Sequence, residues 1–281
     1  MKIRNIKFQK SSLELLDKIK IILEDYNQRG IRVTLRQLYY QLVGAGFIPN
    51  NDKQYKKLSG LLTKARYSGL VSWEAIEDRG RNPNIPNTFK DVSELLKIAA
   101  ESYALDRWQE QEYYVEVWTE KDALSSIIVP ITRKYQVPMV VNRGFSSASS
   151  MYESAQRFLE HSDKKIILLY LGDHDPSGLD MDRDIQARLN EFGVSVEVIR
   201  IGLTYEQVQQ YNPPENPTKI KDVRAKEYIK KYGYSCWEVD ALKTEVTQQL
   251  IEENILKYLD LDKYRQVQEQ EQKDLEELKN A

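Results

Sequence analysis

The sequence has few residues of the kinds that form cross-links or hold soft metal ions. Among 281 residues there is one cysteine, Cys236, and there are two histidines, His161 and His174. These counts exclude an internal disulfide and any cysteine-rich or histidine-rich zinc site. A Ser-His-Asp triad stays open only through one of the two histidines. Any catalytic metal is therefore expected on carboxylates, which favour a hard cation such as magnesium.

Long apolar runs are also missing. No stretch reaches the roughly 18 apolar residues of a membrane-spanning helix. The charged residues at 1–7 are not followed by the apolar core of a signal peptide. With 41% hydrophobic and 30% charged residues, the composition is typical of a soluble globular protein. We therefore expect a cytoplasmic protein with no membrane contact, long enough for two ordinary domains.

The net charge of -2 hides an asymmetry between the two ends of the chain. Residues 1–90 hold 17 lysines and arginines against 8 aspartates and glutamates, whereas the remainder holds 24 against 35. A basic first part joined to an acidic second part suggests that the first part binds a polyanion. A basic surface that is merely solvated would give the same excess.

The basic part of the sequence predicts three helices. The first covers residues 11–28, the second begins at Thr34 with a capping-box pattern, and the third covers about residues 53–67. One side of the third helix is apolar, and its other side is basic: Lys53, Lys56, Lys57, Lys64 and Arg66. With a wing strand at 71–76, this order is typical of a winged helix-turn-helix that binds double-stranded DNA. Three small helices with a solvated basic side are the plainer alternative.

Beyond a loop at residues 78–92 and a helix at 92–110, strand and helix patterns alternate. Strands are expected at 114–118, 138–141, 165–171 and 194–199, and helices at 122–135, 147–161 and 178–192. This alternation predicts an α/β domain with a mostly parallel sheet and helices on both faces. We expect a domain at residues 1–90 and a second at 91–281. The second contains a loop with three prolines at 211–217 and ends in helices at 244–259 and after residue 263.

Carboxylates stand at the predicted carboxyl ends of two strands, where such sheets bind ligands. Glu120 follows the first strand, and Asp173 and Asp175 follow the third. Three carboxylates that converge there need a cation, and magnesium bound in this way still accepts phosphate oxygens. Each motif alone has a structural explanation, since Glu120 could belong to a surface turn and Asp175 could cap the helix that Pro176 begins.

These residues resemble a known family. Glu120-Lys121-Asp122-Ala123, followed by Asp173-x-Asp175-Pro176-x-Gly178, is similar to the Toprim domain of topoisomerase VI A subunits and of the related meiotic double-strand-break proteins. Arg143-Gly144-Phe145-Ser146 stands where that family has a glycine-aromatic turn. The resemblance implies a Rossmann-like Toprim domain behind a winged-helix domain. It also implies that Glu120 is a general acid/base or metal ligand and that Asp173 and Asp175 bind Mg²⁺.

The same family has an arginine, two further residues and then a tyrosine pair in its winged-helix domain. This chain has Arg36, followed by Tyr39 and Tyr40, in its basic part. The resemblance implies that Tyr40 attacks a DNA phosphorus and leaves a 5′-phosphotyrosyl link. Arg36, one helical turn before Tyr40, lies on the same helix face and could stabilise the phenolate or the phosphate. Simple packing of both tyrosines is the alternative in a chain with 18 of them.

The resemblance also carries expectations about partners. In the family, the metal site that serves a tyrosine belongs to the other subunit of a homodimer. The chain is shorter than a typical A subunit and has no ATPase segment, so a separate GHKL-type ATPase partner stays open. Residues 237–242 either add acidic side chains to the site or only begin a helix. The leading hypothesis is a magnesium-dependent DNA transesterase. A hydrolytic Toprim nuclease and a non-enzymatic DNA-binding protein are the alternatives.

Overall fold

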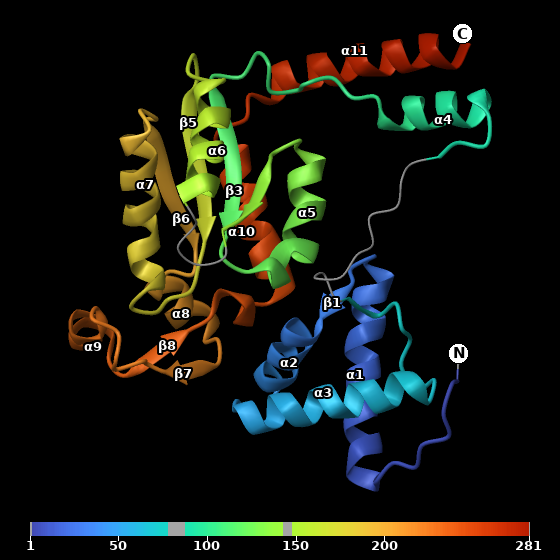
Figure 1. Cartoon of the computed structure of the whole chain (residues 1–281), viewed down its shortest axis with the longest axis vertical. Helices are drawn as coiled ribbons and strands as arrows, with labels where there is room; N and C mark the ends of the chain where they lie inside the picture. Colours follow the sequence, from blue (N-terminus) through green and yellow to red (C-terminus); the bar gives the residue numbers. More distant parts are fainter. Residues whose placement is uncertain (1, 78–87, 143–147, 281) are drawn as a thin grey trace.

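A computed structural model describes residues 2–77, 88–142 and 148–280, and it shows an α/β fold with a helical N-terminal region (Figure 1). This region contains α1 (Lys10–Gln28), α2 (Leu35–Gly44) and α3 (Asp52–Tyr67). The predicted start of α2 is confirmed, because Thr34 and Gln37 exchange the two hydrogen bonds of a capping box. Buried apolar residues of all three helices, among them Leu16, Leu38 and Leu62, form a core of their own.

The segment after α3 differs from the predicted wing strand. Its extended part is β2 (Ile76–Glu77), which pairs in parallel with β1 (Val33–Thr34), immediately before α2. Arg66 of α3 donates hydrogen bonds to the carbonyl oxygens of Trp73 and Ile76, so side-chain bonds replace strand pairing over residues 71–75. Residues 78–87 of the predicted loop lie outside the described residues.

The second part of the chain forms a four-stranded parallel sheet, which confirms the predicted architecture. Its strands follow the order β4-β3-β5-β6. Their bounds are β3 (Tyr113–Thr119), β4 (Met139–Val141), β5 (Lys165–Leu171) and β6 (Val196–Gly202). Because β3 and β5 are neighbours with Thr119 opposite Leu171, residues that follow these two strands emerge side by side.

Helices cover both faces of this sheet. Val117 and Leu169 belong to a core with α5 (Ser125–Lys134) and α10 (Thr244–Leu256). Their chain neighbours Trp118 and Leu168 face a second core, with α6 (Ala148–Leu159) and α7 (Met181–Glu191). Side chains alternate between the faces of a strand, so strands that are apolar throughout need a helix layer on each side. Figure 1 shows α7 and α5 on opposite sides of the strands.

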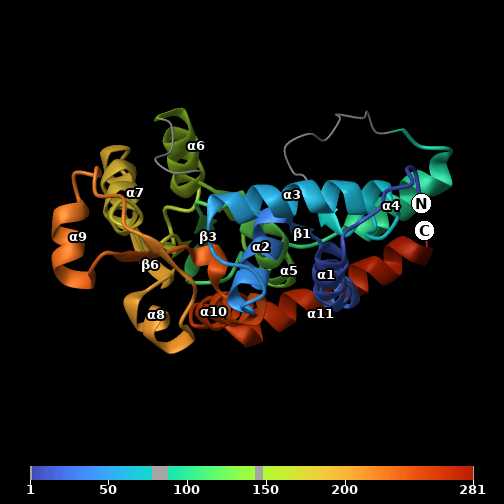
Figure 2. The ribbon, with the colours of Figure 1, turned by 90° about the horizontal axis from the view of Figure 1, so that it is seen from below.

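The remaining elements surround the carboxyl-terminal edge of the sheet or extend from it. Short helical turns are η1 (Asp122–Leu124), η2 (Gly178–Asp180) and η3 (Val239–Ala241), and the further helices are α8 (Tyr205–Tyr211) and α9 (Ala225–Tyr232). The predicted loop at 211–217 contains β7 (Glu215–Pro217), which pairs with β8 (Ser235–Trp237) in an antiparallel ribbon. Figure 2 shows α9 at one end of the molecule and α4 with the chain termini at the other.

One predicted helix is shorter than expected. The helix expected at 92–110 ends early, as α4 (Val92–Ser102), and Tyr103 is extended. Arg107 instead forms an ion pair with Glu271 of α11 (Leu261–Asn280), with 2.6 Å between the charged atoms. These tertiary contacts outweigh the local preference of residues 103–110 for a continued helix. In the described part of the chain, no helix is long and apolar enough to cross a membrane.

Candidate functional site

The adjacent ends of β3 and β5 bring two of the predicted carboxylates into contact. Glu120 is the first residue after β3, and its backbone N–H donates to the Leu171 carbonyl at 3.4 Å. Its carboxylate accepts a hydrogen bond from the backbone N–H of Asp173 at 3.1 Å. Glu120 and Asp173 therefore meet at the carboxyl edge of the sheet, as their position in the sequence predicted.

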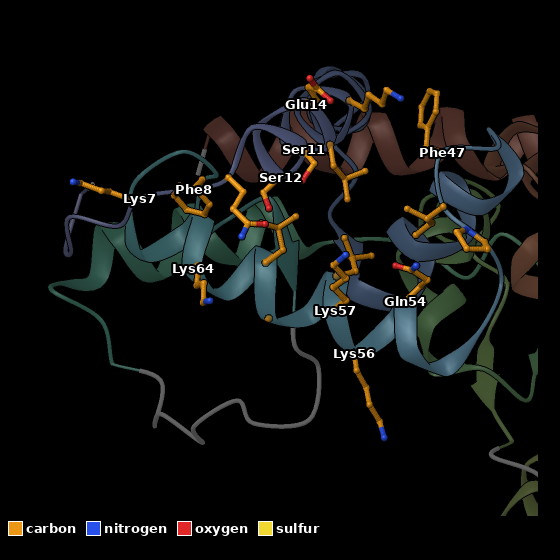
Figure 3. Close-up of a pocket in the computed structure, with 18 residues that line it drawn as sticks. Lys7, Phe8, Ser11, Ser12, Glu14, Phe47, Gln54, Lys56, Lys57 and Lys64 are labelled. Carbon is orange, nitrogen blue, oxygen red and sulfur yellow. The ribbon is translucent and has the colours of Figure 1, made fainter.

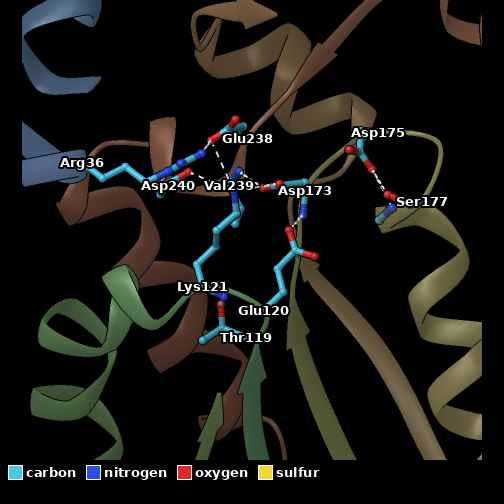
Figure 4. Close-up of polar contacts among 12 residues, drawn as sticks. Arg36, Thr119, Glu120, Lys121, Asp173, Asp175, Ser177, Glu238, Val239 and Asp240 are labelled. Atoms are coloured by element: carbon cyan, nitrogen blue, oxygen red, sulfur yellow. Dashed lines mark hydrogen bonds and ion pairs between the residues drawn. The ribbon is translucent and has the colours of Figure 1, made fainter. Parts of the chain in front are cut away.

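Asp175 makes different contacts from those of Asp173. Its Oδ1 accepts hydrogen bonds from the Gly178 backbone at 2.6 Å and from the Ser177 hydroxyl at 3.1 Å. Figure 4 shows its side chain directed toward Ser177 and away from Glu120. Asp175 thus caps the turn that leads into η2 and α7, which is the structural alternative that Pro176 suggested.

A second acidic segment, residues 238–240, lies beside Asp173. His174 and Trp237 form an antiparallel bridge, with N···O distances of 2.8 and 3.1 Å, which joins the turn after β5 to β8. Val239, two residues after Trp237, donates its backbone N–H to Asp173 Oδ1 at 2.9 Å. This pairing places Glu238 and Asp240 on either side of that bond, so this segment adds acidic side chains beside Asp173 and does not only begin a helix.

Lys121 occupies the centre of these carboxylates (Figure 4). Its Nζ lies 2.8 Å from Asp173 Oδ2, 3.2 Å from Glu238 Oε2 and 3.6 Å from Asp240 Oδ1. Burial opposes the charge on Lys121, but the surrounding carboxylates outweigh it and raise the pKa of this ammonium group above its usual value. Lys121 is therefore a permanently charged counter-ion at neutral pH.

Arg36 connects α2 to the same acidic segment. Its Nε donates to Asp240 Oδ2 at 2.9 Å, and its terminal nitrogen pairs with Glu238. The guanidinium carbon also lies 5.6 Å from the centre of the Tyr40 ring, so the predicted common face of Arg36 and Tyr40 is confirmed. We call Arg36, Lys121, Asp173, Glu238 and Asp240 the charged cluster.

Tyr40 lies against this cluster within its own chain. Its side chain is buried, and its hydroxyl donates a hydrogen bond to the Glu238 carboxylate. Tyr39 instead donates to Asn50 Oδ1 at 3.0 Å and accepts from the Asn51 backbone at 2.8 Å. Of the two tyrosines, Tyr39 fixes the loop before α3, whereas Tyr40 faces the charged groups.

The cluster makes Tyr40 a poor nucleophile unless a cation assists it. Burial, and then the negative charge of Glu238, raise the pKa of the Tyr40 hydroxyl far above its ordinary value of about 10. Burial also opposes the charge of Glu238, but Lys121, Arg36 and the hydrogen bond from Tyr40 outweigh it and lower the pKa of this carboxyl to about 2. Glu238 therefore orients the hydroxyl, and removal of the phenolic proton needs positive charge nearby.

The donor chemistry of the site fits magnesium, because Mg²⁺ prefers carboxylate oxygens. Glu120, Asp173, Glu238 and Asp240 supply such oxygens around the carboxyl ends of β3 and β5. Within residues 2–77, 88–142 and 148–280, no three His, Cys, Asp or Glu side chains are already spaced as ligands of one metal ion. The oxygens are spaced around the Lys121 ammonium instead.

Three of the predicted DNA-contacting lysines border a groove between α3 and the start of α1, which has a volume of about 670 Å³ (Figure 3). Lys56, Lys57 and Lys64 line it, as do Lys7 and Lys18, which the sequence pattern did not single out. The lining includes a single acid, Glu14. Lys53 is exposed outside the lining, whereas Arg66 is half-buried in its bonds to residues 73 and 76.

One residue that supports the site had no recognisable signal in the sequence. Arg200 of β6 lies against the turn after β5 and pairs with Asp182 at 2.8 Å. It donates further hydrogen bonds to the carbonyl oxygens of Gly172, Asp173 and Gly178. It thus fixes the backbone that carries Asp173. The turn at 143–146, which supported the resemblance, lies outside the described residues.

Comparison with known proteins does not assign the chain to a family: no protein-family model matches it, and no curated protein is significantly similar to it.

Proposed function

We propose that this protein is a magnesium-dependent DNA-cleaving transesterase of the kind that the resemblance to topoisomerase VI A subunits implies. The observation that carries the proposal is the contact between Tyr40 and the charged cluster. A hydroxyl and a guanidinium of α2 meet the carboxylates of segment 238–240, which lie about 200 residues further along the chain. Such convergence of nucleophile, cation and metal ligands is typical of a phosphoryl-transfer site.

In the proposed reaction, the Tyr40 oxygen forms a bond to a DNA phosphorus while the bond from that phosphorus to the 3′ oxygen breaks. The phenolic proton balances the charge on the leaving 3′ oxygen. Glu238 orients the hydroxyl, and Arg36 is close enough to stabilise charge on the phenolate and the phosphate. Mg²⁺ held by the acidic residues would add charge stabilisation in the transition state.

The N-terminal region supplies the proposed DNA-binding surface. We infer a winged-helix-like domain whose groove lysines contact the phosphates of double-stranded DNA, since five lysines face a single glutamate there. In the described part of the chain, none of these five lysines forms an ion pair. They are therefore available to phosphate, and their contacts would fix the position of DNA without reading its sequence.

The resemblance suggests that each protomer of a homodimer offers its tyrosine to its partner. In this structure Tyr40 touches the acidic residues of its own chain, so the tyrosine and the acidic residues meet without a second copy. We retain the homodimer as a prediction and propose that each chain contains both the tyrosine and the acidic residues of one site. A GHKL-type ATPase partner also stays a prediction.

The test is cleavage of supercoiled plasmid with Mg²⁺, stopped with detergent and analysed with and without protease. Wild type should give broken DNA that is linked to protein, and Tyr40→Phe should give neither the adduct nor the break. Tyr39→Phe is the matched control and should keep the adduct, because Tyr39 bonds to the loop before α3.

A hydrolytic nuclease is the second candidate, because Glu120 contacts Asp173 without any contribution from Tyr40. It predicts that Tyr40→Phe still cuts DNA and that no adduct forms in wild type. A non-enzymatic DNA-binding protein predicts no cutting at all, with DNA binding lost on substitution of Lys56 and Lys57 and unaffected by Asp173→Ala.

A further inference from the structure

We propose that Asp173, Glu238 and Asp240 form a divalent-cation site in which the Lys121 ammonium is a resident counter-ion that Mg²⁺ displaces. This inference deepens the proposed function, because it names cation ligands that differ from the Glu120, Asp173 and Asp175 set of the resemblance. It concerns binding of the cation by the protein alone, so it can be tested without DNA.

Carboxylate oxygens of the cluster are arranged around one cation. Oxygens of all three carboxylates lie within 3.6 Å of Lys121 Nζ, and they come from two separate segments, the turn after β5 and the segment at 238–240. The bridge between His174 and Trp237 and the bond from Val239 to Asp173 hold these segments together. The backbone thus fixes three anionic groups around a point that already carries positive charge.

One buried carboxylate oxygen of the cluster lacks a hydrogen bond among the described residues. The Asp240 side chain is fully buried, and among the described residues its Oδ1 finds no hydrogen-bond partner. The nearest cationic atom to it, Lys121 Nζ, is 3.6 Å away, too far for a hydrogen bond. A buried carboxylate oxygen without a partner is costly, and such atoms commonly mark a place for an ion or ligand. Asp240 Oδ1 is directed into the cluster, where a small divalent ion would satisfy it.

Negatively charged groups outnumber positively charged groups at this site. Four carboxylates, those of Glu120, Asp173, Glu238 and Asp240, gather around two cationic groups, Arg36 and Lys121. Replacing the singly charged ammonium by a doubly charged ion would balance more of this excess. Mg²⁺ binds oxygens at about 2.1 Å, so the carboxylates must move inward when the ammonium leaves. This explains why they are not yet at metal-ligand spacing.

Asp175 offers the sharpest contrast with this ligand set. Its Oδ1 is used by the Gly178 backbone and the Ser177 hydroxyl, and its side chain is directed away from Lys121 (Figure 4). The same substitution, aspartate to asparagine, can therefore be made at a proposed ligand and at a proposed helix cap. The two sites give opposite expectations for cation affinity.

The experiment is titration of the full-length protein with Mn²⁺, followed by electron paramagnetic resonance, without DNA. Asp240→Asn and Glu238→Gln should each weaken binding at least tenfold, and Asp175→Asn should change it less than threefold. Lys121→Met should strengthen binding, because it removes the competing ammonium. Weakening by Asp175→Asn with none by Asp240→Asn would overturn the proposal in favour of the resemblance's ligand set.

Weaker binding by Lys121→Met would overturn it too, since the ammonium would then be needed beside the ion. If Lys121→Met is too unstable to titrate, millimolar Mn²⁺ should restore its urea midpoint toward that of wild type, and no restoration would refute the exchange. The titration also separates this inference from the proposed function, because it contains no DNA: the expected ligand effects in a protein that forms no DNA adduct would support the cation site and refute the transesterase.

Discussion

Arg36 is the residue on which the contact between the N-terminal region and the acidic residues depends most. It binds Asp240 and Glu238 through different nitrogens and also approaches the Tyr40 ring. Lysine has one compact charged group and cannot make these two contacts in the same plane. The guanidinium is thus needed for its shape as well as for its charge.

We therefore expect Arg36→Lys to lower the rate of adduct formation by about tenfold to a hundredfold, although the charge is kept. Arg29→Lys is the matched control, because Arg29 pairs with Asp25 and Glu245 at the surface. Single-turnover adduct formation on a labelled duplex measures both. Equal rates for wild type and Arg36→Lys would remove Arg36 from the reaction.

At the scale of single residues, the sequence predicts which residues belong to the candidate site better than it predicts their contacts. The spacing of Arg36 and Tyr40 on one helix placed them on a common face, and the strand ends placed Glu120 beside Asp173. The outward direction of Asp175 could not be predicted, because an aspartate before Pro176 serves equally as a ligand or as a cap.

At the scale of elements, the turn between β5 and η2 determines where Asp173 points. Gly178 closes this turn, and a Cβ atom on it would lie 2.3 Å from the Asp173 carbonyl oxygen. Asp175 caps the Gly178 N–H from one side, and Arg200 binds its carbonyl from the other. The turn therefore has no space for a side chain at this position.

We expect Gly178→Ala to destabilise the protein by about 1–3 kcal/mol, because the Asp173 backbone must shift. Gly60→Ala in α3 is the control, since a Cβ atom on Gly60 would meet no atom within 4 Å and alanine favours the helix by about 1 kcal/mol. Urea denaturation measures both changes. A Gly178→Ala protein as stable as wild type would show that the turn is not constrained in this way.

His174 in the same turn makes stability depend on pH. Burial lowers the pKa of its imidazole from 6.5 to about 4, so the folded protein holds it neutral while the unfolded chain takes up a proton near pH 6.5. The contribution of His174 to the free energy of unfolding is thus fully present above pH 6.5, and it falls by about 3 kcal/mol as the pH drops to 4. His174→Gln should show a smaller loss between these pH values in urea titrations, and an unchanged loss would assign it to other groups.

Local signals explain which elements could be predicted. The capping box at Thr34 and the apolar run of β5 identify their elements from a few neighbouring residues. By contrast, β7 and β8 are each three residues long and exist through pairing with a distant segment, as Glu215 opposite Trp237 shows. Such pairing leaves no periodic pattern, so the loop predicted at 211–217 concealed a strand.

At the scale of the whole molecule, the N-terminal region and the sheet domain meet through polar contacts. Tyr26 and Thr244 share a hydrogen bond of 2.6 Å, and Asn50 donates to Asn216 at 2.7 Å. The bonds of Arg36 to Asp240 and Glu238 and the ion pair of Arg29 with Glu245 add to this contact. These pairs are far apart in the chain, so the sequence alone predicted two domains but not their arrangement.

This arrangement predicts the outcome of mixing two defective proteins. Tyr40→Phe and Asp173→Asn chains, co-expressed with different tags and purified through both, should form mixed oligomers without adduct formation, because each chain has a damaged site. Tyrosine donation across a dimer predicts partial activity instead, since one composite site would be intact. Each variant purified alone is the control and should be inactive in either case.

The most direct test of the central claim is to identify the amino acid that becomes linked to DNA. After cleavage with Mg²⁺ and digestion with nuclease and trypsin, mass spectrometry of the peptide from residues 37–53 measures where the nucleotide is attached. We expect one nucleotide, joined through its 5′ phosphate to Tyr40. DNA cleavage with this peptide unmodified, or with the nucleotide on Tyr39, would contradict it.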